Sequence, residues 1–297
     1  MNLPNVYILG AAKCGTTSLA HQLSNHDDIF LVNGKETHFL SSDEKFAKGQ
    51  QFYAKKFLVG YNKERVILDA TPEYLAKPDL IIPRLHQIHQ NSQHLKFIIV
   101  LRDPLARLLS HYSHRARTFN ETRTIEEAVL ADMERINAPS PSDWSNYFTE
   151  GLYAKHLSQW FHNFPEAHFL VLTLSDIAKN NDNSISKILH FLDLQDSGSL
   201  KHMKHENKRS KSILPAVSRM VAQQWPLKIY LKKALPKYQR RKLAKWIHLA
   251  TQRPTKDRLT ISDDIEHLIV QAYQKDVKQL RSMNICNTTD WKNFLEN

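Results

Sequence analysis

The 297-residue sequence is poor in the residues that mark disulfide-rich, disordered or repetitive proteins. It has two cysteines, Cys14 and Cys286, which excludes a disulfide framework and favours a reducing compartment. Seven glycines and twelve prolines are too few for a disordered chain, and there is no internal repeat. No apolar run reaches the ~18 residues of a membrane span, and the first expected strand already starts at Val6. We therefore expect neither signal peptide nor membrane anchor, and a cytoplasmic protein.

Acidic residues are absent from one long segment. Residues 213–256 contain eleven Lys or Arg and no Asp or Glu, and they account for the whole net charge of +11. Four aromatic residues are interleaved with these charges: Trp225, Tyr230, Tyr238 and Trp246. We expect this basic segment to be a mostly helical C-terminal extension. It is either a solvated helical face that packs on the rest of the protein, or a peripheral contact for an anionic membrane or a polyanionic acceptor.

The N-terminal residues predict a strand, a tight loop and a helix. The apolar run Val6–Leu9 is typical of a buried strand, Gly10 and Gly15 bound the loop, and the helix opens with hydroxyl-bearing residues from Thr16. Backbone N–H groups at such a helix start converge on an anion. The usual phosphate loop has lysine where this chain has Thr16, and Lys13 lies inside the loop instead. A lysine with hydroxyls can bind an anion without Mg²⁺; the alternative is a turn without a ligand.

A second motif follows the most apolar strand, Phe97–Leu101, which is typical of the centre of a parallel sheet. Arg102 comes directly after it, at the edge where ligands bind in open α/β sheets. Asp103 is the expected N-cap of a helix that starts at Pro104 and carries Ser110 two turns later. Arg102 is therefore a second candidate anion contact, with a surface salt bridge as the alternative.

Strands and helices alternate along the rest of the chain. Expected strands are 6–9, 29–32, 66–69, 97–101 and 169–172, and expected helices start at 16 and 104 or span 42–57, 79–90, 125–136, 152–164, 184–192 and 263–283. This order predicts an α/β fold with a P-loop-like central parallel sheet and helices on both faces. We expect one domain over residues 1–297. Three His-x-x-His pairs, 86/89, 111/114 and 202/205, lack a companion Cys or carboxylate, so no metal site is expected.

The two motifs together resemble sulfotransferases that use 3′-phosphoadenosine 5′-phosphosulfate (PAPS). The resemblance is closest to the carbohydrate branch of the heparan-sulfate enzymes and their bacterial relatives. It implies that the first loop holds the 5′-phosphosulfate and that Arg102 and Ser110 hold the 3′-phosphate. The loop residues that match are Lys13, Cys14, Gly15, Thr16, Thr17 and Ser18.

Three further stretches extend this resemblance. Residues 35–39 are similar to the family's Lys-Glu-x-His-Phe stretch, which makes Glu36 the catalytic base. Residues 69–74 match a loop that usually has lysine before Thr/Ser-Pro, where this chain has Ala70. Lys208, Arg209 and Ser210 resemble a basic loop that closes the nucleotide site, and without a cysteine pair to staple it we expect this loop to be mobile. The residues expected to face the acceptor are Lys35, His38, Thr71 and His114.

The implied reaction is in-line transfer of a sulfuryl group from PAPS to a hydroxyl or amine of a carbohydrate or lipid-linked acceptor. Lys13 would stabilise the departing phosphate while Glu36 takes the acceptor's proton. Nucleic acid is not an expected partner. Two alternatives stay open. A P-loop kinase or NTPase would use the end of Val66–Asp69 to hold a metal, but this sequence lacks the Gly-Lys-Ser/Thr step of such enzymes. A non-enzymatic polyanion-binding protein would explain the basic segment but not the loop.

Overall fold

The computed structural model describes residues 2–117, 121–135, 146–165, 168–195, 210–212, 252–254 and 261–294. Lys208, Arg209 and nearly all of the basic segment lie outside these residues. The expected helical content of that segment and the expected mobility of the basic loop therefore stay predictions.

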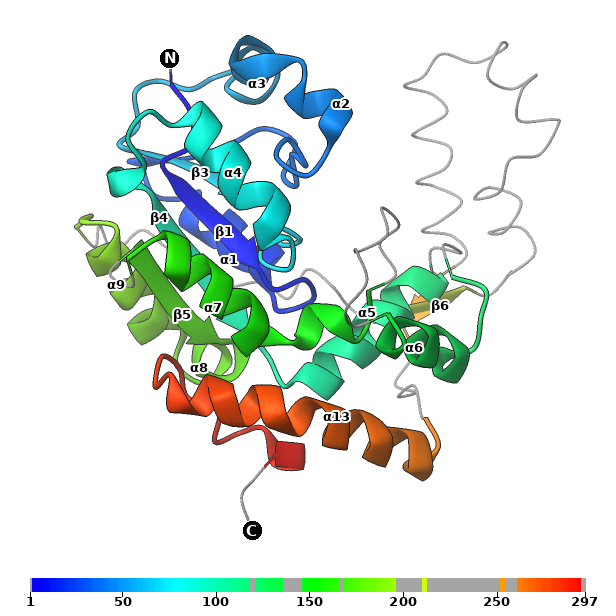
Figure 1. The fold of residues 1–297 in the computed structure, drawn as a ribbon. Helices are drawn as coiled ribbons and strands as arrows, with labels where there is room; N and C mark the ends of the chain where they lie inside the picture. Colours follow the sequence, from blue (N-terminus) through cyan, green and yellow to red (C-terminus); the bar gives the residue numbers. More distant parts are fainter. Residues whose placement is uncertain are drawn as a thin grey trace, which may run out of the picture.

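Five parallel strands form the central sheet (Figure 1). They are β1 (Val6–Gly10), β2 (Ile29–Leu31), β3 (Val66–Ala70), β4 (Lys96–Leu101) and β5 (Phe169–Thr173), in the spatial order β2-β3-β1-β4-β5. Every residue of β1 and β3 is buried, which explains why apolar residues follow one another in these strands instead of alternating with polar ones; Asp69 of β3 is the exception. The predicted parallel sheet is confirmed, and its centre is β1, the strand that leads into the first loop.

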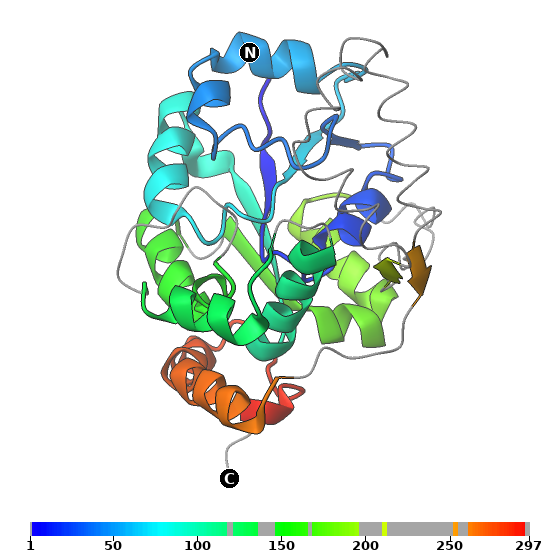
Figure 2. The same cartoon turned by 90° about the vertical axis from the view of Figure 1, so that its right-hand side faces the viewer.

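Helices cover both faces of this sheet, as predicted. Figure 2 shows α4 (Pro78–Ile88) and α7 (Tyr153–Asn163) on one side and α1 (Thr16–Leu23) and α9 (Asn181–Phe191) on the other. Two hydrogen bonds of 2.7 and 3.1 Å between side-chain amides join α1 to α9. Helices thus cover both faces of the sheet. A ligand can therefore approach the sheet at the edge where the strands end.

The segment 42–57 is not the single helix that its aromatic spacing suggested. It forms α2 (Asp43–Phe46) and α3 (Gly49–Phe57), because the φ of 74° at Gly49, the first residue of α3, prevents a right-handed helix from continuing out of α2. A further short helix, α8 (Leu174–Lys179), was not expected; the side chain of Thr173 caps its first turn.

The last helix, α13 (Asp263–Ser282), ties the C-terminal part of the chain to the sheet domain. The Asp276 carboxylate accepts the backbone N–H groups of Ala154 and Lys155 at 3.0 and 2.9 Å, so it caps α7 from a distant part of the chain. The remaining elements are α5 (Pro104–Arg117), α6 (Ile125–Met133), the 3₁₀ helices Ser92–His94, Thr149–Gly151 and Lys292–Phe294, and the antiparallel pair β6 (Ser210–Ser212) and β7 (Gln252–Pro254). Of the helices in the described ranges, none combines the length and apolarity needed to cross a bilayer.

Candidate functional site

The first loop leaves β1 at the carboxyl edge of the sheet. The backbone N–H of Ala11 donates to the carbonyl of Val100 in the adjacent strand at 2.8 Å, which holds the loop beside the end of β4. Gly15 stands immediately before α1 with a φ of 82°, a conformation that glycine adopts without strain. Cys14 and Thr16 are buried, whereas the residues with half-buried side chains are Lys13, Thr17 and Ser18. The predicted strand, loop and helix start are present.

The second motif brings α5 to the same edge. The Asp103 carboxylate accepts the Ala106 N–H at 2.8 Å and caps the helix, as the sequence predicted. Ser110, His114 and Arg117 are four and three residues apart, so they share one face of α5. The Arg117 guanidinium donates to Nδ1 of His114 at 3.2 Å.

Positive charges crowd around Lys13. Burial lowers the pKa of its ammonium, the positive charges of Arg117 and Arg102 lower it further, and the Glu36 carboxylate acts in the opposite direction. Burial, with the charges of Lys13 and Arg117, lowers the pKa of His114 to about 4. The loop and α5 therefore form a cationic site, in which the charges of Arg117 and Arg102 act against the charge of Lys13.

One carboxylate lies at this cationic site. Lys35 donates to the Thr17 hydroxyl at 3.1 Å and also lies 3.5 Å from Oε1 of Glu36, so it links the base candidate to the loop. The other Glu36 oxygen lies 3.8 Å from Nε2 of His38. The structure thus brings the predicted residues of the two stretches together.

Below this surface, a buried carboxylate anchors the stretch that carries Glu36. Asp69 accepts the hydroxyls of Thr37 at 2.8 Å, Thr71 at 2.7 Å and Tyr53 at 3.0 Å. Burial raises the pKa of Asp69, while these three hydrogen bonds act to lower it. Thr71, which was expected to face the acceptor, is fully buried in this anchor.

Glu73 is a site residue that the sequence did not reveal. It accepts Nδ1–H of His38 at 2.7 Å and the Ser41 hydroxyl, and its second oxygen lies 3.1 Å from Nζ of Lys77. Burial by itself would raise the pKa of Glu73, but the His38 hydrogen bond, the Lys77 charge and the Ser41 hydrogen bond outweigh it and lower the pKa to about 2. Arg117 was missed too, although helical spacing from Ser110 through His114 would have pointed to it.

The histidine pairs do not form metal sites where the structure describes them. His111 is buried 3.5 Å from a Glu150 oxygen, and the His86 ring stacks on Phe164 with 5.0 Å between ring centroids. Within the described ranges, no three His, Cys, Asp or Glu side chains are grouped so that they could hold a metal ion. The pair 202/205 lies outside those ranges.

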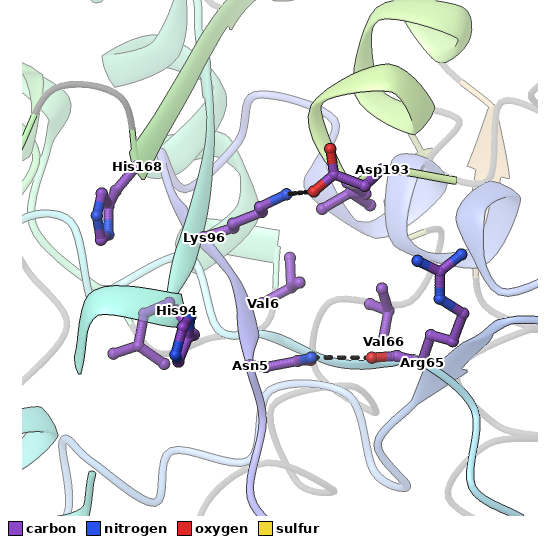
Figure 3. A pocket seen from close by; sticks show the side chains of 10 residues that line it. Asn5, Val6, Arg65, Val66, His94, Lys96, His168 and Asp193 are labelled. Carbon is purple, nitrogen blue, oxygen red and sulfur yellow. Dashed lines mark hydrogen bonds and ion pairs between the residues drawn. The ribbon is translucent and has the colours of Figure 1, made fainter. Parts of the chain in front are cut away.

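A pocket of about 440 Å³ lies at the opposite edge of the sheet (Figure 3). Val6, Val66 and Lys96, which line it, are the first residues of β1, β3 and β4, whereas the Lys13 loop follows the last residue of β1. Lys96 in this pocket is paired with Asp193. The pocket is thus separate from the cationic site.

Comparisons with known proteins agree with this geometry. The family model described as sulfotransferase domain matches residues 3–253. Heparan sulfate glucosamine 3-O-sulfotransferase 6 of Homo sapiens is 28% identical over 199 residues, which cover 67% of this chain and 55% of that protein. The 3-O-sulfotransferase 3B1 of Mus musculus is 28% identical over 193 residues, covering 65% and 47%. The chain spans about half the length of these curated relatives.

One solved structure matches nearly the whole chain. A sulfotransferase from Alicyclobacillus acidocaldarius superposes with a TM-score of 0.68 and 21% identity, covering 98% of this chain and 100% of that one. At this identity the match establishes a common fold.

The depressed pKa of Glu73 predicts a pH-dependent loss of stability in Glu73→Gln. Because the folded-state pKa lies near 2 and the ordinary value is 4.5, the ionised carboxylate stabilises the fold above pH 4.5, and this contribution disappears as the pH falls toward 2. At pH 7 the variant should lose up to about 3 kcal/mol of unfolding free energy, at 1.36 kcal/mol per pKa unit. Urea unfolding of both proteins at several pH values measures this difference. Glu44→Gln, at a carboxylate that is 82% exposed, is the control; a Glu73→Gln deficit that stays constant down to pH 2 would contradict the prediction.

Proposed function

Because this chain belongs to the sulfotransferase domain family, we propose that it transfers a sulfuryl group from PAPS to a hydroxyl or amine of an acceptor. The observation that carries the proposal is the half-buried Lys13 in a strand-to-helix loop, surrounded by Arg102, Arg117 and a single nearby carboxylate, Glu36. Such a site favours an anionic donor, and Glu36 offers a carboxylate that can take a proton.

The residues at the site suit a donor with two anionic groups. Lys13, the hydroxyls of Thr17 and Ser18 and the N–H groups at the start of α1 would hold the 5′-phosphosulfate. Arg102 follows β4, and Ser110 lies on the face of α5 that also carries His114, so these two would hold the 3′-phosphate. Arg117 and Arg102 contribute to the lowered pKa of Lys13, and the negative charge of such a nucleotide would offset this crowding of positive charge.

PAPS supplies an activated sulfuryl group, and the protein positions the reactants and stabilises charge. Glu36 would take the proton of the attacking hydroxyl or amine. Lys13 would stabilise the negative charge that develops on the departing phosphate. Lys35, in contact with both Thr17 and Glu36, would hold the base at a fixed place beside the donor loop.

We propose a carbohydrate hydroxyl as the acceptor, and a saccharide carried on a lipid as its alternative. The support comes from the curated relatives, which are named as sulfotransferases of heparan sulfate glucosamine. Incubation with labelled PAPS and a panel of amino-sugar oligosaccharides, glycolipids, phenols and peptides tests the choice. Label that enters only phenols or peptides would contradict it. Nucleic acid is not a proposed partner.

Lys13→Ala should abolish transfer while the fold persists. The variant removes the charge that stabilises the leaving phosphate, and alanine leaves the apolar packing of the loop in place. Transfer of label from PAPS and a circular dichroism spectrum measure the two effects. Lys187→Ala, at an exposed position of α9, is the matched control; unchanged turnover in folded Lys13→Ala would rule out the role of this loop.

Glu36→Gln and Arg102→Ala should separate chemistry from binding. Glu36→Gln keeps the shape of the side chain but removes the base, so kcat should fall by ~10² to 10⁴ with little change in PAPS affinity. Arg102→Ala should instead weaken PAPS binding by about 1.5 to 3 kcal/mol, the range for a hydrogen bond to a charged group. Steady-state kinetics and calorimetric titration give both values. A Glu36→Gln enzyme with the wild-type kcat would remove Glu36 as the base.

The basic segment supports a further proposal, recruitment of a cytoplasmic enzyme to an anionic membrane or an acidic polysaccharide. Its support is compositional: eleven basic residues without an acidic one, interleaved with four Trp or Tyr. Each Lys or Arg near an anionic bilayer contributes ~1 kcal/mol, so a few of them suffice for reversible attachment.

Charge reversal tests this recruitment. Replacing Lys232, Lys233, Arg240 and Arg241 by Glu should abolish co-sedimentation with phosphatidylserine vesicles, or binding to immobilised heparin, at low salt. PAPS affinity should not change, since the nucleotide site is formed by other residues. If the wild-type protein binds neither the vesicles nor heparin, the basic segment serves only the packing of the protein.

A further inference from the structure

His38 lies between two carboxylates. Its Nδ1 is 2.7 Å from Oε1 of Glu73, and its Nε2 is 3.8 Å from Oε2 of Glu36. The ring therefore connects the candidate base, at the cationic site, with a carboxylate that lies deeper in the protein.

Glu73 is fitted to hold this ring. Only 8% of the residue is exposed, and it also accepts the Ser41 hydroxyl and pairs with Lys77 at 3.1 Å. It stays ionised at every working pH, since its pKa is lowered to about 2 by those partners. An ionised carboxylate only accepts hydrogen bonds, so Nδ1 of His38 carries the hydrogen and Nε2 is left to face Glu36.

The backbone supports the same arrangement. Glu36 and His38 both have positive φ values, 66° and 50°, which residues with a side chain adopt rarely. Thr37 between them points inward, where its hydroxyl donates to Asp69 and its carbonyl accepts the Lys45 ammonium at 2.7 Å. The buried anchor thus holds two strained residues so that both side chains reach each other. Strain of this kind is concentrated at functional sites.

We propose that Glu73 is a positioning residue that holds His38 as the second member of a Glu36–His38–Glu73 proton relay. This inference rests on the proposed function, since it assigns a path to the proton that sulfuryl transfer releases. Glu73 does not touch the acceptor. It acts through the imidazole, whose orientation and hydrogen position it determines.

The proton passes through the relay in two steps. As the acceptor oxygen bonds to sulfur, its O–H bond breaks and the proton moves to Glu36, while the bond between sulfur and the 5′-phosphate oxygen breaks with its electron pair on the phosphate. Glu36 then passes the proton to Nε2 of His38, 3.8 Å away, through one bridging water or after a small side-chain rotation, and the doubly protonated ring pairs with Glu73. The His38 side chain is 37% exposed, so it can release the proton to water.

Three other charged residues lie near the His38 ring or its partner Glu73. Lys77 and Lys45 act on Glu73, and buried Asp69 interacts with His38 from beneath Thr37. Lys35 pairs with Oε1 of Glu36 at 3.5 Å, whereas Nε2 of His38 faces the other oxygen, Oε2. Removing the Glu73 charge should therefore change the protonation of the ring without removing the base.

The experiment measures kcat of Glu73→Gln and Ser41→Ala as a function of pH. The assay follows transfer of a labelled sulfuryl group from PAPS to an amino-sugar oligosaccharide or, if no oligosaccharide accepts it, to water. Glutamine still accepts the Nδ1 hydrogen but lacks the negative charge that favours imidazolium. We expect kcat to fall about 10-fold or more, by analogy with the loss when the carboxylate behind a metal-bound histidine is removed, and the acid limb of the pH–kcat profile to move to lower pH. Ser41→Ala removes a hydrogen bond to the same carboxylate but leaves its charge, so its acid limb should stay in place. Affinity for adenosine 3′,5′-bisphosphate should be unchanged in both.

His38→Ala keeps the proposal falsifiable if Glu73→Gln does not fold. Its kcat should fall similarly and recover in part when imidazole is added, since a free imidazole can take the proton from Glu36. The relay alone is overturned if the acid limb of the Glu73→Gln pH–kcat profile does not move. It is also overturned if added imidazole does not raise the kcat of His38→Ala. Wild-type protein that moves no label from PAPS to any acceptor, water included, overturns the proposed function and with it the relay.

Discussion

The repulsion among Lys13, Arg102 and Arg117 is the interaction on which the candidate site depends. It persists because the fold fixes each cation independently: Lys13 by the loop that hydrogen-bonds to β4, Arg102 by the end of that strand, and Arg117 by α5. The backbone positions of these three residues are therefore set by the sheet and by α5. The free energy of this crowding is therefore available to bind an anion, which is what a sulfonucleotide offers at both of its ends.

A second constraint lies beneath the first. Asp69 at the end of β3 is buried and satisfied by three hydroxyls, and one of them belongs to Thr37. Because Thr37 is held inward, its neighbours Glu36 and His38 are presented at the cationic site with positive φ values. Strand β3, which lies next to β1 in the sheet, thus supports Glu36, the carboxylate of the described site whose charge acts on Lys13.

The features that the sequence predicted are local ones. The five strands, the loop from Gly10 to Gly15, the Asp103 cap and the position of Arg102 follow from apolar runs, glycine spacing and capping residues. The break at Gly49 and the pairing of His38 with Glu73 could not be predicted in this way, because they depend on left-handed backbone and on contacts 35 residues apart in the chain. The roles of Lys208 and Arg209, the extent of a single domain and the cellular location stay predictions.

The most direct test of a sulfonucleotide site is calorimetric titration of the wild-type protein with adenosine 3′,5′-bisphosphate and, separately, with ATP and Mg²⁺. Two phosphate groups on the ribose, held by the Lys13 loop and by Arg102 with Ser110, require the bisphosphate to bind the more tightly, and without added metal. Tighter binding of ATP–Mg²⁺ than of adenosine 3′,5′-bisphosphate would contradict this and favour a P-loop kinase or NTPase.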